Sequence, residues 1–155
     1  MSPRMLLDTG VLVHIVRESA FWERLGPLLG VRLSEALVSR ITHGELLSLA
    51  SRRQWGAIRM AVWEEVFGKM TVLEITDEVA EQYAAIQSFL HARPKGSQAN
   101  RGENDCWIAA CCIATGATLV TMDQDFNPLH PAMLSRILVR QNSDRSLSLI
   151  DGPTR

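Results

Sequence analysis

The sequence predicts an α/β domain with a central, mostly parallel, twisted sheet of about five strands flanked by helices. Short apolar runs alternate along the chain with longer stretches whose apolar residues recur at helical spacing. Strands that alternate with helices are typical of a parallel sheet, because parallel neighbours need a crossover connection that is usually a helix. Acidic residues also follow two of the apolar runs, as expected where buried strands reach the surface.

The length of 155 residues favours one domain, since about 150 residues suffice to bury a substantial core. We expect a single domain over 1–155, with its core at about 4–140 and a polar C-terminal tail at 141–155. The last residues, after Gly152 and Pro153, are expected to fray.

The apolar runs predict five strands in chain order: 5–7, 36–39, 72–75, 118–122 and 137–139. A pair of helices is expected between the second and third strands, the first over 42–52. The second helix is indicated by apolar residues at helical spacing, namely Ile58, Val62, Val66 and Met70. This pair could pack on the core, form a dimer face or clamp a partner.

A third helix is predicted over 77–90, and a fourth begins near Asp105 and continues through Ala109. The chain's three cysteines, Cys106, Cys111 and Cys112, fall within this fourth helix and lack the spacing of metal ligands. They are therefore predicted to be reduced, small core residues.

Charge and hydropathy limit the choice of partners. Lys and Arg number 16 against 17 Asp and Glu, a net charge of -1, so nucleic acid would have to bind through local basic patches. The apolar stretch over 5–16 is interrupted by Asp8 and His14 and is too short to cross a bilayer. We expect a soluble, cytoplasmic protein with no membrane partner.

Four carboxylates lie where these elements meet the surface. Asp8 and Asp123 follow the first and fourth strands, and Glu45 and Asp105 lie near helix N-termini. In an open parallel sheet these positions share one rim, so the four side chains are expected to converge. At 4 Å each like-charged pair costs about 1–4 kcal/mol, which a divalent cation would relieve. Carboxylates suit Mg²⁺ or Mn²⁺, and such a site suits phosphodiester hydrolysis by an activated water.

Each acidic residue also has a structural alternative. Asp8 and Asp123 could open turns, and Asp125 could cap a short helix. The run from Thr42 to Glu45 fits a capping box, in which the glutamate bonds to a free backbone N–H. Asp105 would be favoured in the first turn of a helix by the helix dipole.

Together these motifs resemble PIN-domain ribonucleases, and the size and layout resemble the VapC toxins of bacterial toxin–antitoxin pairs, over about 5–139. The family has an Asp after the first strand, a Glu in Thr-x-x-Glu-Leu, an Asp before Ile-Ala-Ala and an Asp in Thr-x-Asp-x-Asp-Phe. These match Asp8, Glu45, Asp105 and Asp123. The resemblance implies a PIN-like three-layer fold in which the four acids hold one or two Mg²⁺ or Mn²⁺ ions and form the catalytic site.

By the same resemblance, Thr9 and Thr121 line the site, and Thr121 positions the substrate or a water. Asp125 is either a fifth acidic participant or the residue that holds the following turn. The chain departs from the family at Gly10, where Asn or Ser is common, so a hydrogen bond near the first ligand is missing. This difference bears on metal affinity and substrate fit.

The resemblance further implies a toxin that acts as an endoribonuclease and leaves 5′-phosphate and 3′-hydroxyl ends. It also implies a homodimer and a VapB-like antitoxin, often one that binds DNA, and allows a larger assembly of the two proteins. RNA would need phosphate contacts from basic residues, whose alternative is solvated surface charge. The candidates are Arg52, Arg53, Arg93, Lys95 and Arg101. Trp107 could stack on a base, although its helical position favours packing in the core.

Two other function classes remain open. A catalytically inactive PIN-fold module could bind RNA or protein, although all four acids are intact. The run Leu-Leu-Asp-Thr-Gly at 6–10 also matches the catalytic turn of a retropepsin-like aspartic protease, in which two Asp residues share a proton. That fold is almost entirely β, whereas the regions around Tyr83 and Ala109 have helical patterns.

Overall fold

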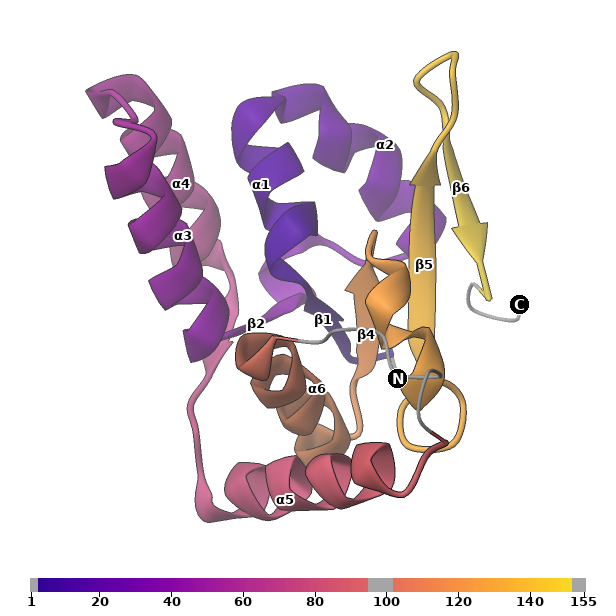
Figure 1. Cartoon of the computed structure of the whole chain (residues 1–155). Coiled ribbons are helices and arrows are strands. Elements are labelled where there is room, and N and C mark those ends of the chain that lie inside the picture. The colour runs from indigo at the N-terminus through magenta and orange to yellow at the C-terminus, as the bar shows by residue number, and fades with distance from the viewer. Residues whose placement is uncertain (1–2, 95–101, 152–155) are drawn as a thin grey trace.

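The computed structural model describes residues 3–94 and 102–151 (Figure 1). Its elements in chain order are β1 (Met5–Leu7), α1 (Thr9–Arg17), α2 (Ser19–Leu29), the 3-10 helix η1 (Leu33–Glu35), β2 (Leu37–Ser39), α3 (Arg40–Arg52), α4 (Ala57–Lys69), β3 (Thr71–Leu73), α5 (Asp77–His91), α6 (Glu103–Thr115), β4 (Thr118–Thr121), the 3-10 helix η2 (Gln124–Leu129), β5 (Arg136–Gln141) and β6 (Leu147–Ile150).

The strands described form one six-stranded sheet in the order β3-β2-β1-β4-β5-β6. All neighbouring strands are parallel except β5 and β6, which are antiparallel. The central strand is β1, where Leu6 aligns with Leu37 of β2 and Leu119 of β4. The chain order reverses at β1, so the carboxyl ends of β1 and β4 flank a topological switch point, the usual ligand position in such sheets.

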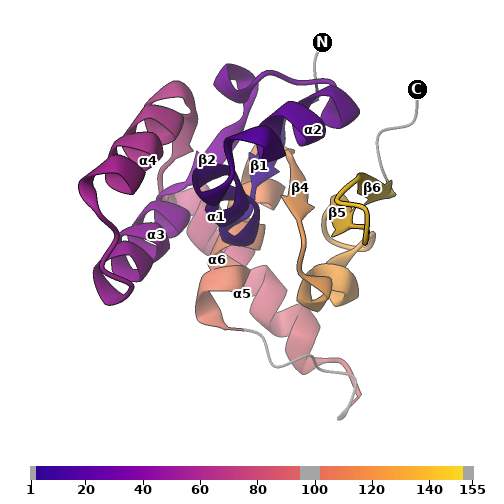
Figure 2. The ribbon, with the colours of Figure 1, turned by 90° about the horizontal axis from the view of Figure 1, so that it is seen from above.

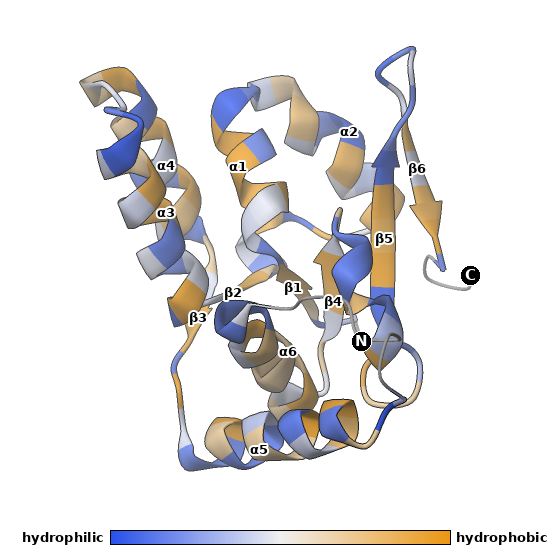
Figure 3. Ribbon diagram, in the orientation of Figure 1, coloured by the Kyte–Doolittle hydropathy of each residue, from blue (hydrophilic) through white to orange (hydrophobic). Residues whose placement is uncertain are grey.

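Helices cover both faces of the sheet and make three layers. In Figure 2, α2 and α5 lie on opposite sides of the strands. Side chains alternate along β1, so Leu6 packs in the cluster under α5 and α6, whereas Met5 and Leu7 pack in the cluster under α1 and α2. The strands are accordingly apolar on both faces (Figure 3). The predicted three-layer fold is confirmed.

Most elements lie where the sequence predicted them, and the third helix, α5, extends the predicted 77–90 by one residue. The third strand begins one residue earlier than 72–75 and ends at Leu73. The polar tail contains an unpredicted strand, β6, which pairs with β5 while Leu147 and Leu149 pack against the core. The residues predicted to fray, 152–155, lie outside the described part of the chain.

The predicted helix pair between the second and third strands is α3 and α4. One residue of the predicted apolar face is misplaced, because Ile58 is 86% exposed. It lies in the first turn of α4, while Val62 and Val66 further along pack against the core, and Trp63 is buried. Helical spacing correctly predicted which side of α4 is apolar, but it did not predict that the core ends before the first turn of this helix.

The three cysteines are buried in the core and are not joined by disulfides, as predicted. Among the helices described, none combines the length and apolarity needed to cross a membrane.

Candidate metal centre

Asp8 is fixed by the end of β1 and the start of α1. It is the N-cap of α1, and its Oδ1 accepts the Thr9 backbone N–H at 2.8 Å. Its Oδ2 accepts the Thr121 hydroxyl at 2.7 Å, and the residue is only 5% exposed. Asp8 therefore does open a turn, which was its structural alternative. A role in the turn alone does not explain why its carboxylate is buried and accepts hydrogen bonds from two donors.

Asp123 follows β4 and is the N-cap of η2, where its Oδ1 accepts the Asp125 backbone N–H at 2.8 Å. The Asp123 N–H in turn donates to the Thr121 hydroxyl at 3.0 Å. Thr121 is fully buried and thus contacts both acids from behind. Thr121 is not among the residues that line the cleft, and its hydroxyl bonds to Asp8 and to the backbone of Asp123, so its expected part in positioning substrate or a water stays a prediction.

Glu45 projects from the second turn of α3. The predicted capping box is wrong, because α3 begins after Ser39, whose hydroxyl caps the helix, and Thr42 lies inside it. Instead, Glu45 Oε1 accepts the Thr9 hydroxyl at 2.7 Å. The buried Thr42 hydroxyl lies 3.0 Å from the Thr9 Oγ1. Sequence reasoning missed this role of Thr42, although its Thr-x-x-Glu motif was the available signal.

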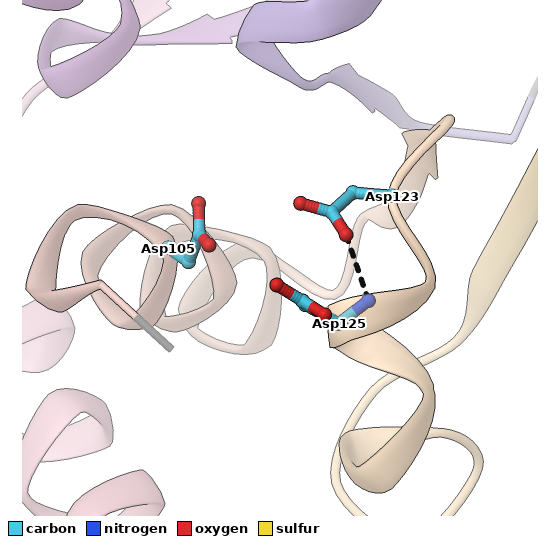
Figure 4. Close-up of side chains that lie close together, drawn as sticks. All are labelled: Asp105, Asp123 and Asp125. Carbon is cyan, nitrogen blue, oxygen red and sulfur yellow. Dashed lines mark hydrogen bonds between the residues drawn. The ribbon is translucent and has the colours of Figure 1, made fainter. Parts of the chain in front are cut away.

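Asp105 lies in the first turn of α6, as predicted. Its carboxylate faces Asp123 and Asp125 across the gap between α6 and η2 (Figure 4), and oxygens of the three lie within 4.8 Å of one another. The carboxylate of Asp125 thus lies with those of Asp105 and Asp123, while the turn is held by the Asp123 side chain, which accepts the Asp125 backbone N–H.

The four predicted acids share one cleft of about 520 Å³ at the switch point, the acidic cleft, which Asp8, Thr9, Gly10, Glu45, Asp105, Met122, Asp123 and Gln124 line. A Cβ at Gly10 would meet no atom within 4 Å, so this position has room for a side chain. The donor set of clustered carboxylate oxygens is one that Mg²⁺ or Mn²⁺ prefers.

The environment of Asp8 disfavours its negative charge. Burial raises the pKa of Asp8 from 3.8 to about 6, against the opposing hydrogen bonds from Thr121 and Thr9. The negative charges of Glu45 and Asp123 raise the pKa of Asp8 further.

The pKa of Asp105 rises further still, to about 7, first through burial. Neighbouring negative charges add to this rise, in decreasing order Asp8, Asp123, Glu45 and Asp125. A cation bound among the acids would therefore favour the ionised forms of Asp8 and Asp105 at neutral pH.

We predict that the metal-free protein loses stability as pH rises from about 4 to 7. Asp8 and Asp105 bind protons more tightly folded than unfolded, so their contribution is complete below pH 4 and disappears as pH passes about 6 and 7. Urea unfolding in EDTA at pH 5 and pH 8 measures the loss, on the order of 1–3 kcal/mol. The free energy of unfolding should depend less on pH in Asp105→Asn than in wild type, and Mg²⁺ should restore the stability of the wild type at pH 8. An equal change between pH 5 and pH 8 in wild type and variant would contradict this prediction.

The basic residues predicted to bind RNA that the structure describes do not gather in one place. Arg52 lines a groove next to the acidic cleft, and Arg53 lines another groove with Trp55. Arg93 donates to the Pro128 carbonyl at 3.1 Å and so has a structural contact. Lys95 and Arg101 lie outside the described residues.

Trp107 stacks on Tyr83, with ring centroids 4.0 Å apart. It packs against the core cluster under α5 and α6, as its helical position favoured.

Comparison with known proteins identifies the family of this chain. Residues 5–129 match the family model described as PIN domain, and the chain therefore belongs to the PIN-domain family. The predicted family is confirmed, and the α/β fold rules out the retropepsin alternative, which required an almost entirely β structure. Curated protein sequences gave no significant match.

The fold is that of VapC toxins. VapBC2 from Rickettsia felis, solved bound to a DNA fragment from its promoter, is 21% identical with a TM-score of 0.70, covering 85% of this chain and 96% of that one. VapBC-1 from nontypeable Haemophilus influenzae is 25% identical with a TM-score of 0.64, covering 85% and 95%. VapC20 of Mycobacterium tuberculosis, a toxin that cleaves the sarcin-ricin loop, is 15% identical with a TM-score of 0.59, covering 81% and 95%.

Proposed function

We propose that this protein is a divalent-metal-dependent endoribonuclease and the toxin of a VapBC-type toxin–antitoxin pair. The observation that carries the proposal is the convergence of Asp8, Glu45, Asp105 and Asp123 in one cleft at the switch point of a PIN-domain fold. The similarity to VapC20, whose substrate is the sarcin-ricin loop, supports RNA as the substrate class.

In this proposal Asp8, Glu45, Asp105 and Asp123 hold one or two Mg²⁺ or Mn²⁺ ions, and Asp125 supports the cluster. The bound ion supplies charge neutralisation and activation of a water for attack on phosphorus. Thr121 orients Asp8, and Thr9 orients Glu45 through its hydroxyl. Attack of water on phosphorus breaks the bond to the 3′ oxygen, so the products carry 5′-phosphate and 3′-hydroxyl ends.

The test is cleavage of a mixed, structured RNA pool by the purified chain in Mg²⁺, in Mn²⁺ and in EDTA. We expect cuts in both metals and none in EDTA, because ionised acids alone repel the phosphate. Mapping of the cut ends checks the 5′-phosphate.

The second candidate is an inactive PIN-fold module that binds RNA or protein. It would be favoured if calorimetry detected neither Mg²⁺ nor Mn²⁺ binding and no RNA were cut. The four intact acids and the raised pKa values of Asp8 and Asp105 argue against it, since a binding module has no need to bury carboxylates close to one another.

A VapB-like antitoxin and a homodimer complete the proposal. The support for an antitoxin is that similar structures, including those from Rickettsia felis and Haemophilus influenzae, are VapBC complexes. Light scattering of the purified chain, alone and mixed with a candidate VapB-like antitoxin, tests the dimer and any larger assembly.

A further inference from the structure

A second groove, the α3 groove, adjoins the acidic cleft and shares Glu45 with it. It has a volume of about 390 Å³ and lies between α3 and the first turn of α6. Figure 1 shows α6 close to the end of α3 that follows β2. The α6 side supplies Asn104, directly before the cleft residue Asp105. A chain that leaves the cleft on this side therefore enters the α3 groove.

The wall of the α3 groove is one face of α3. Gly44, Ser48 and Arg52 recur at intervals of four, so they lie above one another along the helix. A Cβ at Gly44 would meet no atom within 4 Å, which leaves the wall open beside Glu45. Gly44, Ser48 and Arg52 are exposed, and Ser48 and Arg52 offer polar groups to a hydrated nucleic-acid strand, while Ile41 adds an apolar contact near the start of α3.

The charges in the α3 groove are unequal. Arg40 is neutralised, since its guanidinium donates to both carboxylate oxygens of Glu74 and also contacts His43. Arg52 is exposed and, within the part of the chain that the structure describes, has neither an ion pair nor a hydrogen bond. Its positive charge is therefore available to a phosphate at the end of the groove away from the acids.

The spacing between Arg52 and Glu45 fits this role. Seven residues of helix rise about 10 Å. A stacked strand advances roughly 3.4 Å per nucleotide. Arg52 thus lies about three nucleotides along a strand whose reacting phosphate is in the acidic cleft.

We infer that a single-stranded segment of the substrate RNA lies along the α3 groove, with a phosphate about three nucleotides from the cut bound by Arg52. The inference rests on the proposed nuclease function. It makes Arg52 a binding residue outside the acidic cleft, and Asn104 and Ser48 polar neighbours of the bound strand.

The test is binding of a mixed-sequence, single-stranded RNA oligonucleotide to the full chain carrying Asp105→Asn, which prevents cleavage. Adding Arg52→Gln should weaken binding roughly three- to tenfold and reduce the slope of log K against log salt by about 0.7. Arg52→Lys should retain most of the binding because it keeps the charge. The matched control is Arg59→Gln, which removes the same charge. Arg59 is an exposed arginine on α4, and it lines the separate groove that also contains Arg53 and Trp55.

Two results would overturn the inference: equal RNA affinity and salt slope in Arg52→Gln and Arg59→Gln, or a loss of partner-protein binding with RNA binding intact. Cleavage is measured separately, with the acids of the cleft unmutated. Absent cleavage by the wild-type chain would count against the nuclease proposal, whereas normal cleavage with an unaltered KM in Arg52→Gln would count against the α3 groove alone.

Discussion

Asp105→Asn is expected to reduce RNA cleavage by roughly 10³-fold or more, equivalent to about 4 kcal/mol of transition-state stabilisation. The same variant should leave the metal-free fold as stable as wild type at pH 8, or more stable by roughly 1 kcal/mol. Asn has nearly the shape of Asp, and the change removes a negative charge that faces four other acids. Single-turnover cleavage and urea unfolding in EDTA measure the two effects.

The matched control is Asp77→Asn. Asp77 is an exposed acid in the first turn of α5, as Asp105 is in the first turn of α6, but it lies outside the acidic cleft. The Asp77→Asn variant should cut RNA normally. Its free energy of unfolding should fall by at most a few tenths of a kcal/mol, because it loses a favourable interaction with the helix dipole. A large loss of stability in Asp105→Asn with normal cleavage would mean that Asp105 serves the helix terminus and not a metal.

Thr121→Val is expected to lower activity roughly 10- to 100-fold and to destabilise the fold by about 1–3 kcal/mol. Valine keeps the shape but leaves Asp8 Oδ2 without its donor and the Asp123 N–H without its acceptor. Since the Thr121 hydrogen bond lowers the pKa of Asp8, its loss should raise that pKa further and weaken metal binding. Calorimetry with Mn²⁺ and thermal unfolding measure these changes.

Thr121→Ser should restore most of the lost activity, because it returns the hydroxyl. Thr118→Val, on the same strand but at its other end, controls for loss of a threonine hydroxyl away from the acids. Equal metal affinity in Thr121→Val and Thr118→Val would show that Asp8 needs no support from Thr121.

The local patterns in the sequence were sufficient to predict much of the fold. Alternating strands and helices are set by hydrophobic periodicity, which is a property of neighbouring residues, so α5 was located almost to its ends. The topology of parallel sheets also placed Asp8 and Asp123 at one rim. Strand β6 was missed because its short run lies in a polar tail, and only pairing with β5 stabilises it.

The roles of the threonines depended on tertiary structure. Serine and threonine are both common at helix N-caps, so the sequence did not decide between Ser39 and Thr42. The start of α3 in the structure shows that Ser39 caps the helix while Thr42 contacts Thr9. Likewise, the 113-residue separation between Asp8 and Thr121 is closed by the pairing of β1 with β4.

The sequence by itself determined the fold class and the family and predicted that Asp8, Glu45, Asp105 and Asp123 lie at one rim, because residue type, spacing and strand order carry that information. Tertiary structure alone decided that Asp125 joins Asp105, that Thr121 is buried behind Asp8 and that Arg52 stands beside the cleft while Arg93 is engaged elsewhere. The physical reason is that hydrogen bonds and pKa shifts depend on distance and burial, which elements far apart in the chain establish only when they pack together.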